Sequence, residues 1–345
     1  MPAEGRALMC CYPSFQKEEI RVNIDIHSHI EIPDAAALLP AGLETTNSPL
    51  SAESAAYQKA HNAAIRDQIL NPERKIADMK AMGLDVTVLS ITPSQFFYNA
   101  EGEAAVRVAR VQNDRIAALV GRYPQAFIGA ASVPMQNVGA AVAELERAVV
   151  ELKLQGVEVG SNIRGRYLGD PVFLPFFEKA RMLNVPVLIH PCNIAGAERM
   201  TDYYLPNLIG NPLDTTITAA TLIFSGIFDR LPGVKILLEH AGGHLPYIIG
   251  RFHHGWKMRP ECRKFIQRSP VEYLGEFYYD TIAHGPEALA YLISRVGVER
   301  VLIGTDHPYD MGDMDPLGSL ASVTELSLEE REMIAGGNAV SLLGR

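Results

Sequence analysis

Two histidines, His27 and His29, stand in the stretch DIHSH at the end of a short apolar run. Residues i and i+2 of a β-strand point the same way, so both imidazoles are expected to face one interior. Two imidazoles on one side are half of a site for a divalent metal ion. Because the histidines of such a pair more often form structural hydrogen bonds, the motif predicts a metal site only if further donors join it.

Three further nitrogen or oxygen donors each close an apolar run: His190 follows VLI, His240 follows ILLE and Asp306 follows VLIGT. A single buried histidine usually bonds a backbone carbonyl, and a single aspartate before a turn usually caps a helix. Donors at four strand ends together instead predict one metal centre. Histidine and carboxylate ligands with a position left for water are typical of catalytic zinc, and manganese and iron also suit this mixed set.

The segments that must position these donors repeat one pattern, in which a capped amphipathic helix, a glycine or proline break and a β-branched run follow one another. In NPERKIADMKAMGLDVTVLSI, Asn71 is expected to cap a helix, Pro72 suits its first turn and Gly83 is expected to end it. Strand candidates are 24–26, 86–91, 127–133, 157–159, 187–189, 235–238, 277–280 and 301–303.

Eight such strands, mostly separated by helical segments, predict an α/β fold of the (β/α)8 TIM-barrel type. An open, doubly wound sheet would use the same alternation. No G-x-G-x-x-G stretch follows the first strand, so a nucleotide-binding sheet of that kind is disfavoured. Because barrel active sites lie at the carboxyl ends of the strands, the donors are expected to meet there.

Residues 31–70 separate the first strand from its helix, which is too long for an ordinary βα loop. We expect an insertion over the barrel mouth. No internal repeat, low-complexity tract or linker divides the sequence, so residues 1–345 are expected to form a single domain.

Composition limits the possible partners. A hydrophobic content of 48% predicts a globular protein with a large core, and a net charge of −9 disfavours a basic surface for nucleic acid or anionic lipid. A small-molecule substrate is therefore expected. The most apolar run, 218–228, is shorter than the roughly 18 residues that a spanning helix needs. Four cysteines at positions 10, 11, 192 and 262 form no disulfide framework, and a cytoplasmic protein is expected.

Longer segments carry a resemblance to a known family. The stretches SVPMQN, GVEVGSN, EHAGGHLPYIIGRFHHGWKMRP, GTDHPYDMG and GGNAVSLLG occur in family order, and the stretch at 250–260 is the most specific. With DIHSH, they make the sequence similar to the metal-dependent amidohydrolase superfamily. Within it, the sequence resembles the non-oxidative decarboxylases typified by 2-amino-3-carboxymuconate-6-semialdehyde decarboxylase.

This resemblance implies a decarboxylase of a small carboxylated aromatic or muconate-semialdehyde-like acid. It implies that one divalent metal ion is held by His27, His29, His190 and Asp306. His240 would stay unligated beside a metal-bound water as the acid/base, which agrees with the chemistry that such a pair offers. Arg66 and Arg251 would bind the anionic substrate, the latter across the interface of a homodimer.

Two positions depart from the family pattern. Cys192 stands where a tryptophan follows the fifth-strand HP, and Tyr309 replaces the aromatic residue of DYPF. Both are expected to line the pocket, so the substrate stays open between an ortho-hydroxy or ortho-amino aromatic acid and a muconate semialdehyde.

Other reactions remain as alternatives. Superfamily hydrolases often bridge two metal ions with a carboxylated lysine or a glutamate of strand four, where this chain has Glu158 and no lysine. A structural contact is the favoured interpretation of Glu158. If Glu158 bridges two metal ions, His240 becomes a ligand and hydrolysis of an amide or lactone becomes the favoured reaction. Hydration of an unsaturated diacid is the third candidate reaction, after decarboxylation and hydrolysis. A metal-stabilised scaffold without activity is disfavoured because all five donors are present. Asp280, which ends strand seven, is a candidate for orienting a neighbour.

Overall fold

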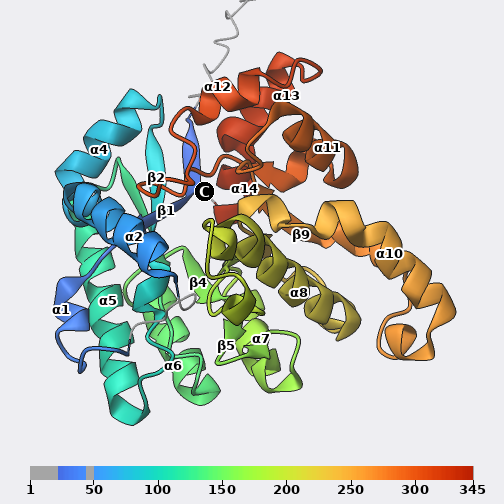
Figure 1. The fold of residues 1–345 in the computed structure, drawn as a ribbon, viewed down its shortest axis with the longest axis horizontal. Helices are drawn as coiled ribbons and strands as arrows, with labels where there is room; N and C mark the ends of the chain where they lie inside the picture. Colours follow the sequence, from blue (N-terminus) through green and yellow to red (C-terminus); the bar gives the residue numbers. More distant parts are fainter. Residues whose placement is uncertain (1–21, 44–49, 345) are drawn as a thin grey trace, which may run out of the picture.

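The computed structural model describes residues 22–43 and 50–344 and contains an eight-stranded parallel sheet in which neighbours in the chain are neighbours in space (Figure 1). The strands are β1 (Ile24–Ile30), β2 (Val86–Ile91), β3 (Phe127–Ala131), β4 (Gly156–Gly160), β7 (Val187–His190), β8 (Ile236–Leu238), β9 (Phe277–Asp280) and β10 (Val301–Leu302). All eight predicted strands are confirmed. Cys10 and Cys11 lie outside the described residues.

The sheet closes on itself between its first and last strands. The Ile26 amide donates to the Ile303 carbonyl at 2.9 Å, and the His29 amide donates to the His307 carbonyl at 3.0 Å. The predicted TIM barrel is therefore confirmed, and the open sheet is excluded.

Helices follow the strands and cover the outside of the barrel (Figure 1). Asn71 caps the first of them as predicted, because its side chain accepts from the amides of Glu73 and Arg74. The principal helices are α4 (Pro72–Ala81), α5 (Gly102–Arg122), α6 (Val138–Val150), α7 (Leu174–Met182), α8 (Asn211–Phe224), α10 (Leu245–Met258) and α11 (Pro286–Val296), and the shorter ones are α9 (Ile227–Arg230), α12 (Pro316–Ala321), α13 (Leu328–Glu332) and α14 (Asn338–Leu343). None of the helices in the described ranges is long and apolar enough to cross a membrane.

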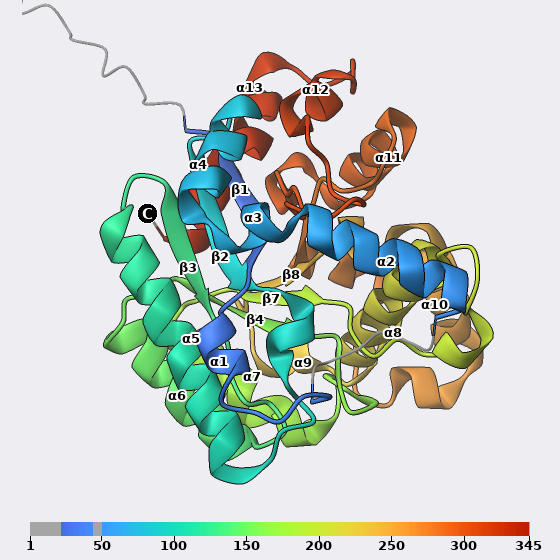
Figure 2. The same cartoon turned by 60° about the vertical axis from the view of Figure 1, so that its left-hand side comes forward.

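The predicted insertion after the first strand contains helices of its own, α1 (Pro33–Ala36), α2 (Ala52–Ala64) and α3 (Arg66–Leu70). Figure 2 shows α2 and α3 as consecutive helices outside the ring of strands. A two-stranded hairpin, β5 (Asn162–Ile163) with β6 (Arg166–Tyr167), follows β4.

At the amino ends of the strands, the barrel interior contains an apolar layer. Side chains from β1, β2, β3, β7, β8 and β10 pack there with α14, namely Ile24, Ile26, Val86, Val88, Ile128, Ala130, Leu188, Leu237, Leu302, Ala339, Leu342 and Leu343. Because side chains alternate along a strand, the next inward positions on β7 and beyond β8 are His190 and Glu239. Polar groups therefore form the interior layer at the carboxyl ends of the strands.

The inward and outward alternation of side chains along β1 is interrupted between the apolar and the polar layer. Ile24 and Ile26 belong to the apolar interior, which by strict alternation would direct His27 and His29 outward. The pairing of β1 with β2 shifts register between Asp25 and Ser28. This irregularity returns the two histidines to the interior.

Candidate metal centre

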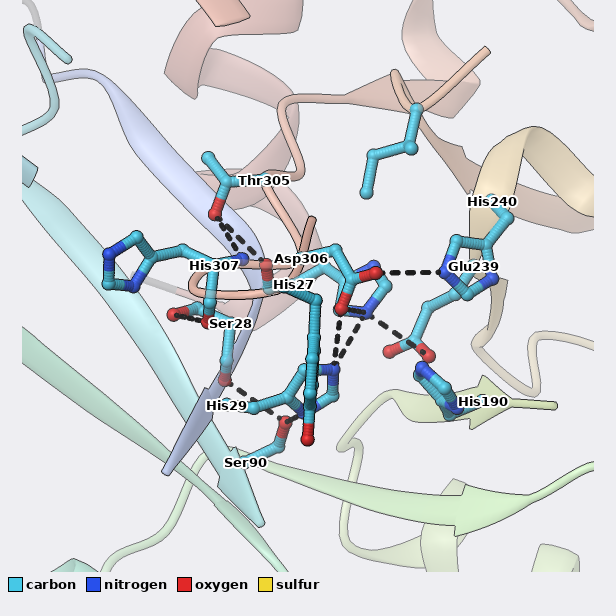
Figure 3. A network of polar contacts seen from close by, with 12 residues as sticks. His27, Ser28, His29, Ser90, His190, Glu239, His240, Thr305, Asp306 and His307 are labelled. Atoms are coloured by element: carbon cyan, nitrogen blue, oxygen red, sulfur yellow. Dashed lines mark hydrogen bonds and ion pairs between the residues drawn. The ribbon is translucent and has the colours of Figure 1, made fainter. Parts of the chain in front are cut away.

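Four side chains converge where the strands end. His27 and His29 come from β1, His190 ends β7 and Asp306 lies in the loop after β10 (Figure 3). Each is buried and offers one ligand atom, and these four atoms all lie within 4.8 Å of one another. The structure thus brings together all four residues that the resemblance implied as ligands.

Hydrogen bonds fix the three imidazole rings from behind. His27 Nδ1 lies 2.8 Å from Asp280 Oδ2, His29 Nδ1 lies 3.2 Å from the Ile91 carbonyl, and His190 Nδ1 lies 2.8 Å from the Pro191 carbonyl. Each Nδ1 therefore carries the proton and donates, which leaves each Nε2 lone pair free for a metal ion. The Nε2 atoms of His27 and His29 are 3.1 Å apart.

Asp306 supplies the oxygen of the set. Its Oδ1 lies 3.1 Å from His29 Nε2 and 3.5 Å from His27 Nε2. These separations suit donors that share one ion at about 2.0–2.2 Å. Burial opposes ionisation of Asp306, but the nearby imidazoles of His240, His29 and His27 outweigh it and hold the pKa well below its usual range. The ionised carboxylate and three free imidazole nitrogens fit a zinc or manganese ion.

His240 lies beside the four ligands, on the turn after β8. Its Nε2 is 3.4 Å from Asp306 Oδ2, and its ring centroid is 5.1 Å from that of His190. Burial lowers the pKa of His240, but the hydrogen bond with Asp306 and the nearby carboxylates outweigh it and give a net increase. The backbone amides of His240 and Ala241 donate to the Asp280 carboxylate at 2.9 and 2.7 Å. Asp280 therefore positions both His27 and this turn.

A cavity of about 530 Å³ opens onto the centre. His190 and Asp306 line it, and the insertion contributes residues from α2 and α3. Arg66, predicted to bind substrate, is one of these. Glu31 also lines the cavity; its burial raises its pKa, and nearby Arg66 partly offsets that increase. The metal centre is therefore reachable by a small molecule that passes charged groups of the insertion.

Tyr309, the second predicted pocket residue, also lines the cavity. Its hydroxyl shares a hydrogen bond with Thr92, and its ring centroid is 5.5 Å from that of His29. Burial raises the pKa of Tyr309, so the phenol is neutral. It presents a polar group beside the metal ligands.

Neither Cys192 nor Arg251 lines this cavity. The Cys192 side chain is fully buried, its sulfur lies 3.5 Å from the Asn162 carbonyl, and burial raises its pKa to about 12. Arg251 is exposed on α10. A contact of either residue with substrate stays a prediction.

Glu158 points into the barrel from β4 but lies behind His29. Its Oε1 accepts from the Ser90 hydroxyl at 2.9 Å and is 3.8 Å from His29 Nδ1, the nitrogen that faces away from the ligand cluster. This position agrees with the structural contact favoured from the sequence.

The sequence analysis did not identify two buried ionisable residues near the centre. Lys75 is fully buried on α4, and its Nζ donates to Ser28 Oγ at 2.9 Å and to His307 Nδ1 at 2.8 Å. Its position four residues before buried Met79 placed it on the packed face of the helix. Glu239 is the other. It stands two residues after inward-facing Leu237, so strand alternation could have predicted that its side chain also faces the interior.

A parallel eight-stranded barrel with three histidines and an aspartate at its strand ends defines a metal-dependent (β/α)8-barrel enzyme site. Residues 24–345 match the amidohydrolase family, so the chain belongs to that family.

Similar proteins are decarboxylases by name. The chain is 38% identical to a 2-amino-3-carboxymuconate-6-semialdehyde decarboxylase of Dictyostelium discoideum over 275 residues, which cover 79% of this chain and 77% of that protein. It is 30% identical to a gamma-resorcylate decarboxylase of Polaromonas over 294 residues, covering 81% and 89%. A dihydroxybenzoic acid decarboxylase structure from Polaromonas, with bound manganese and 2-nitroresorcinol, superposes with a TM-score of 0.79 at 27% identity, covering 94% and 97%.

Proposed function

We propose that this protein is a metal-dependent, non-oxidative decarboxylase of a small carboxylated aromatic or muconate-semialdehyde-like acid. The observation that carries the proposal is the position of His240, which lies beside the buried three-histidine, one-aspartate set and is not one of its four members. The relatives named as decarboxylases support the reaction type.

The chain's own residues have distinct parts in this reaction. Arg66 binds an anionic group of the substrate at the cavity wall, because a guanidinium matches a carboxylate in charge and geometry. His240 Nε2 gives a proton to the carbon that bears the departing carboxylate. That carbon's bond to the carboxylate then breaks, carbon dioxide leaves, and the electron pair of the broken bond stays with the substrate.

A metal ion bound by His27, His29, His190 and Asp306 would supply Lewis acidity and lower the pKa of a coordinated group. We propose zinc as the native ion, with manganese as the second candidate, because histidine nitrogen and carboxylate oxygen accommodate both. The manganese in the Polaromonas relative supports the second candidate.

The proposal extends to the whole chain as a single-domain, cytoplasmic homodimer that binds neither nucleic acid nor membrane. Its net charge of −9 supports the exclusion of nucleic acid. The exposed position of Arg251 supports its use in a partner's site.

Carbon dioxide release tests the reaction. Zinc- and manganese-reconstituted proteins are assayed with ortho-hydroxy and ortho-amino aromatic acids and with carboxymuconate semialdehydes. His240→Ala should lower kcat by about 100- to 10,000-fold, because it removes the proton donor, and should leave the metal content at one ion per chain. Loss of metal in this variant would instead favour the two-metal hydrolase, and amides and lactones would be assayed next.

A further inference from the structure

Glu239 belongs to the same layer of the barrel as the metal ligands. Leu188 of β7 pairs with Leu237 of β8, which pairs with Tyr278 of β9. Two residues further along these three chain segments stand His190, Glu239 and Asp280. Since alternate residues share a face, Glu239 lies between a predicted metal ligand and the residue that orients His27.

The described residues around Glu239 give its carboxyl no lysine or arginine partner. The residue has no exposed surface, and apart from the carboxyl of Glu158, which lies close enough to share a hydrogen bond with it, neither carboxylate oxygen has a hydrogen-bond partner among the described residues. The carboxyls of Glu158, Asp280 and Asp306 are its acidic neighbours. Within the described part of the chain, no lysine or arginine forms an ion pair with it, and Lys75 bonds to the opposite side of β1 at Ser28.

One contact points to the missing counter-charge. Glu239 Oε2 lies 3.7 Å from His27 Nε2, and Figure 3 shows its carboxylate directed at that ring. This Nε2 is the nitrogen left free for a metal ion, because Nδ1 of the same ring is bonded to Asp280. The separation is close to the 3.5 Å between Asp306 Oδ1 and the same nitrogen.

A buried carboxylate without a partner is costly, whereas one that binds a metal ion is stabilised. We propose that Glu239 is a fifth protein ligand of the metal ion and approaches it from the barrel interior through Oε2. The cavity lies on the side of His190 and Asp306, so this approach leaves the substrate side open. This coordination is independent of the reaction that the protein catalyses.

A second carboxylate changes the donor set to three nitrogens and two oxygens. Carboxylate oxygens favour harder ions, so Glu239 should increase the affinity for manganese more than the affinity for zinc. Its loss is therefore expected to weaken manganese binding more than zinc binding.

The test compares Glu239→Gln with Glu158→Gln, a matched control on a neighbouring carboxyl whose Oε1 is already bonded to Ser90. Metal-free proteins are titrated with manganese and with zinc against a competing chelator. Removing a residue that only orients a ligand costs about 10- to 100-fold in affinity, so Glu239→Gln should weaken manganese binding by more than about 100-fold. Glu158→Gln should change it by less than about tenfold.

Coordination is measured directly as well. The cobalt-substituted Glu239→Gln protein should show an altered visible spectrum, because the number of ligands falls, while Glu158→Gln should match the unchanged protein. A manganese-loaded crystal structure should place a Glu239 oxygen about 2.0–2.2 Å from the ion.

Thermal unfolding of the metal-free proteins separates ligand loss from misfolding. Because the metal-free chain buries this carboxyl without a cationic partner, Glu239→Gln should unfold at no lower a temperature than the unchanged chain, yet gain less from added metal. Unchanged manganese affinity with an unchanged cobalt spectrum would overturn the proposal. So would a metal-loaded structure with Glu239 bonded to Glu158 and away from the ion.

Discussion

At the residue scale, the centre is built from ligands whose orientation is set by other groups. The sequence predicted the donors because each closes an apolar strand. It did not predict which nitrogen of each ring faces the ion, since that depends on Asp280 and on the carbonyls of Ile91 and Pro191. Those contacts come from distant segments that only the closed barrel brings together.

Substitution of Asp280 tests whether this residue holds the His27 ring in place. Asp280→Ala removes the acceptor of His27 Nδ1 and of two backbone amides on the His240 turn. Metal affinity should fall by about 10- to 100-fold, because the His27 ring is no longer held in one orientation. Chelator competition measures the change, and Asp280→Asn, which keeps one acceptor oxygen, should lose less. Equal affinity in both variants and the unchanged protein would contradict the orienting role.

At the element scale, strand alternation predicted the inward direction of His27 and His29 but for an incomplete reason. The apolar residues Ile24 and Ile26 also face the interior, and only the irregularity between Asp25 and Ser28 allows both sets to do so. A register shift of this kind depends on pairing with β2 and is not readable from one strand. By contrast, the helix that Asn71 caps has its predicted start because capping is local.

Helix α4 is docked to β1 through Lys75, and this contact predicts a pH dependence of stability. Burial lowers the pKa of Lys75 from 10.5 to about 7. Between these values the unfolded chain binds the proton that the folded chain lacks, so the free energy of unfolding should rise with pH. The slope should reach at most about 1.4 kcal/mol per pH unit.

Urea unfolding between pH 7 and pH 10 checks this slope. The reference is Lys75→Met, which keeps a long side chain but cannot titrate. The difference in unfolding free energy between the unchanged protein and this variant should move in favour of the unchanged protein as the pH rises. Parallel curves for the two proteins would show that Lys75 does not change its protonation on unfolding.

At the scale of the whole molecule, the cavity of one chain contains Arg66 but not Arg251. Arg251 lies on the exposed surface of α10, so it can serve a site only if another chain is docked there. A mixed dimer decides the question because the two arrangements give opposite results. Arg251→Ala chains have an intact metal centre, and His190→Ala chains keep the arginine.

If Arg251 acts across the interface, each single variant should be inactive alone, but their mixed dimer should regain one working site. A chain carrying both changes should then inactivate an unchanged partner, because the partner's site loses its arginine. If Arg251 acts within its own chain, the first mixture stays inactive and the second keeps one site. Carbon dioxide release from purified mixed dimers, with dimer mass checked by sedimentation, distinguishes the cases. A monomer in sedimentation would remove the shared site altogether.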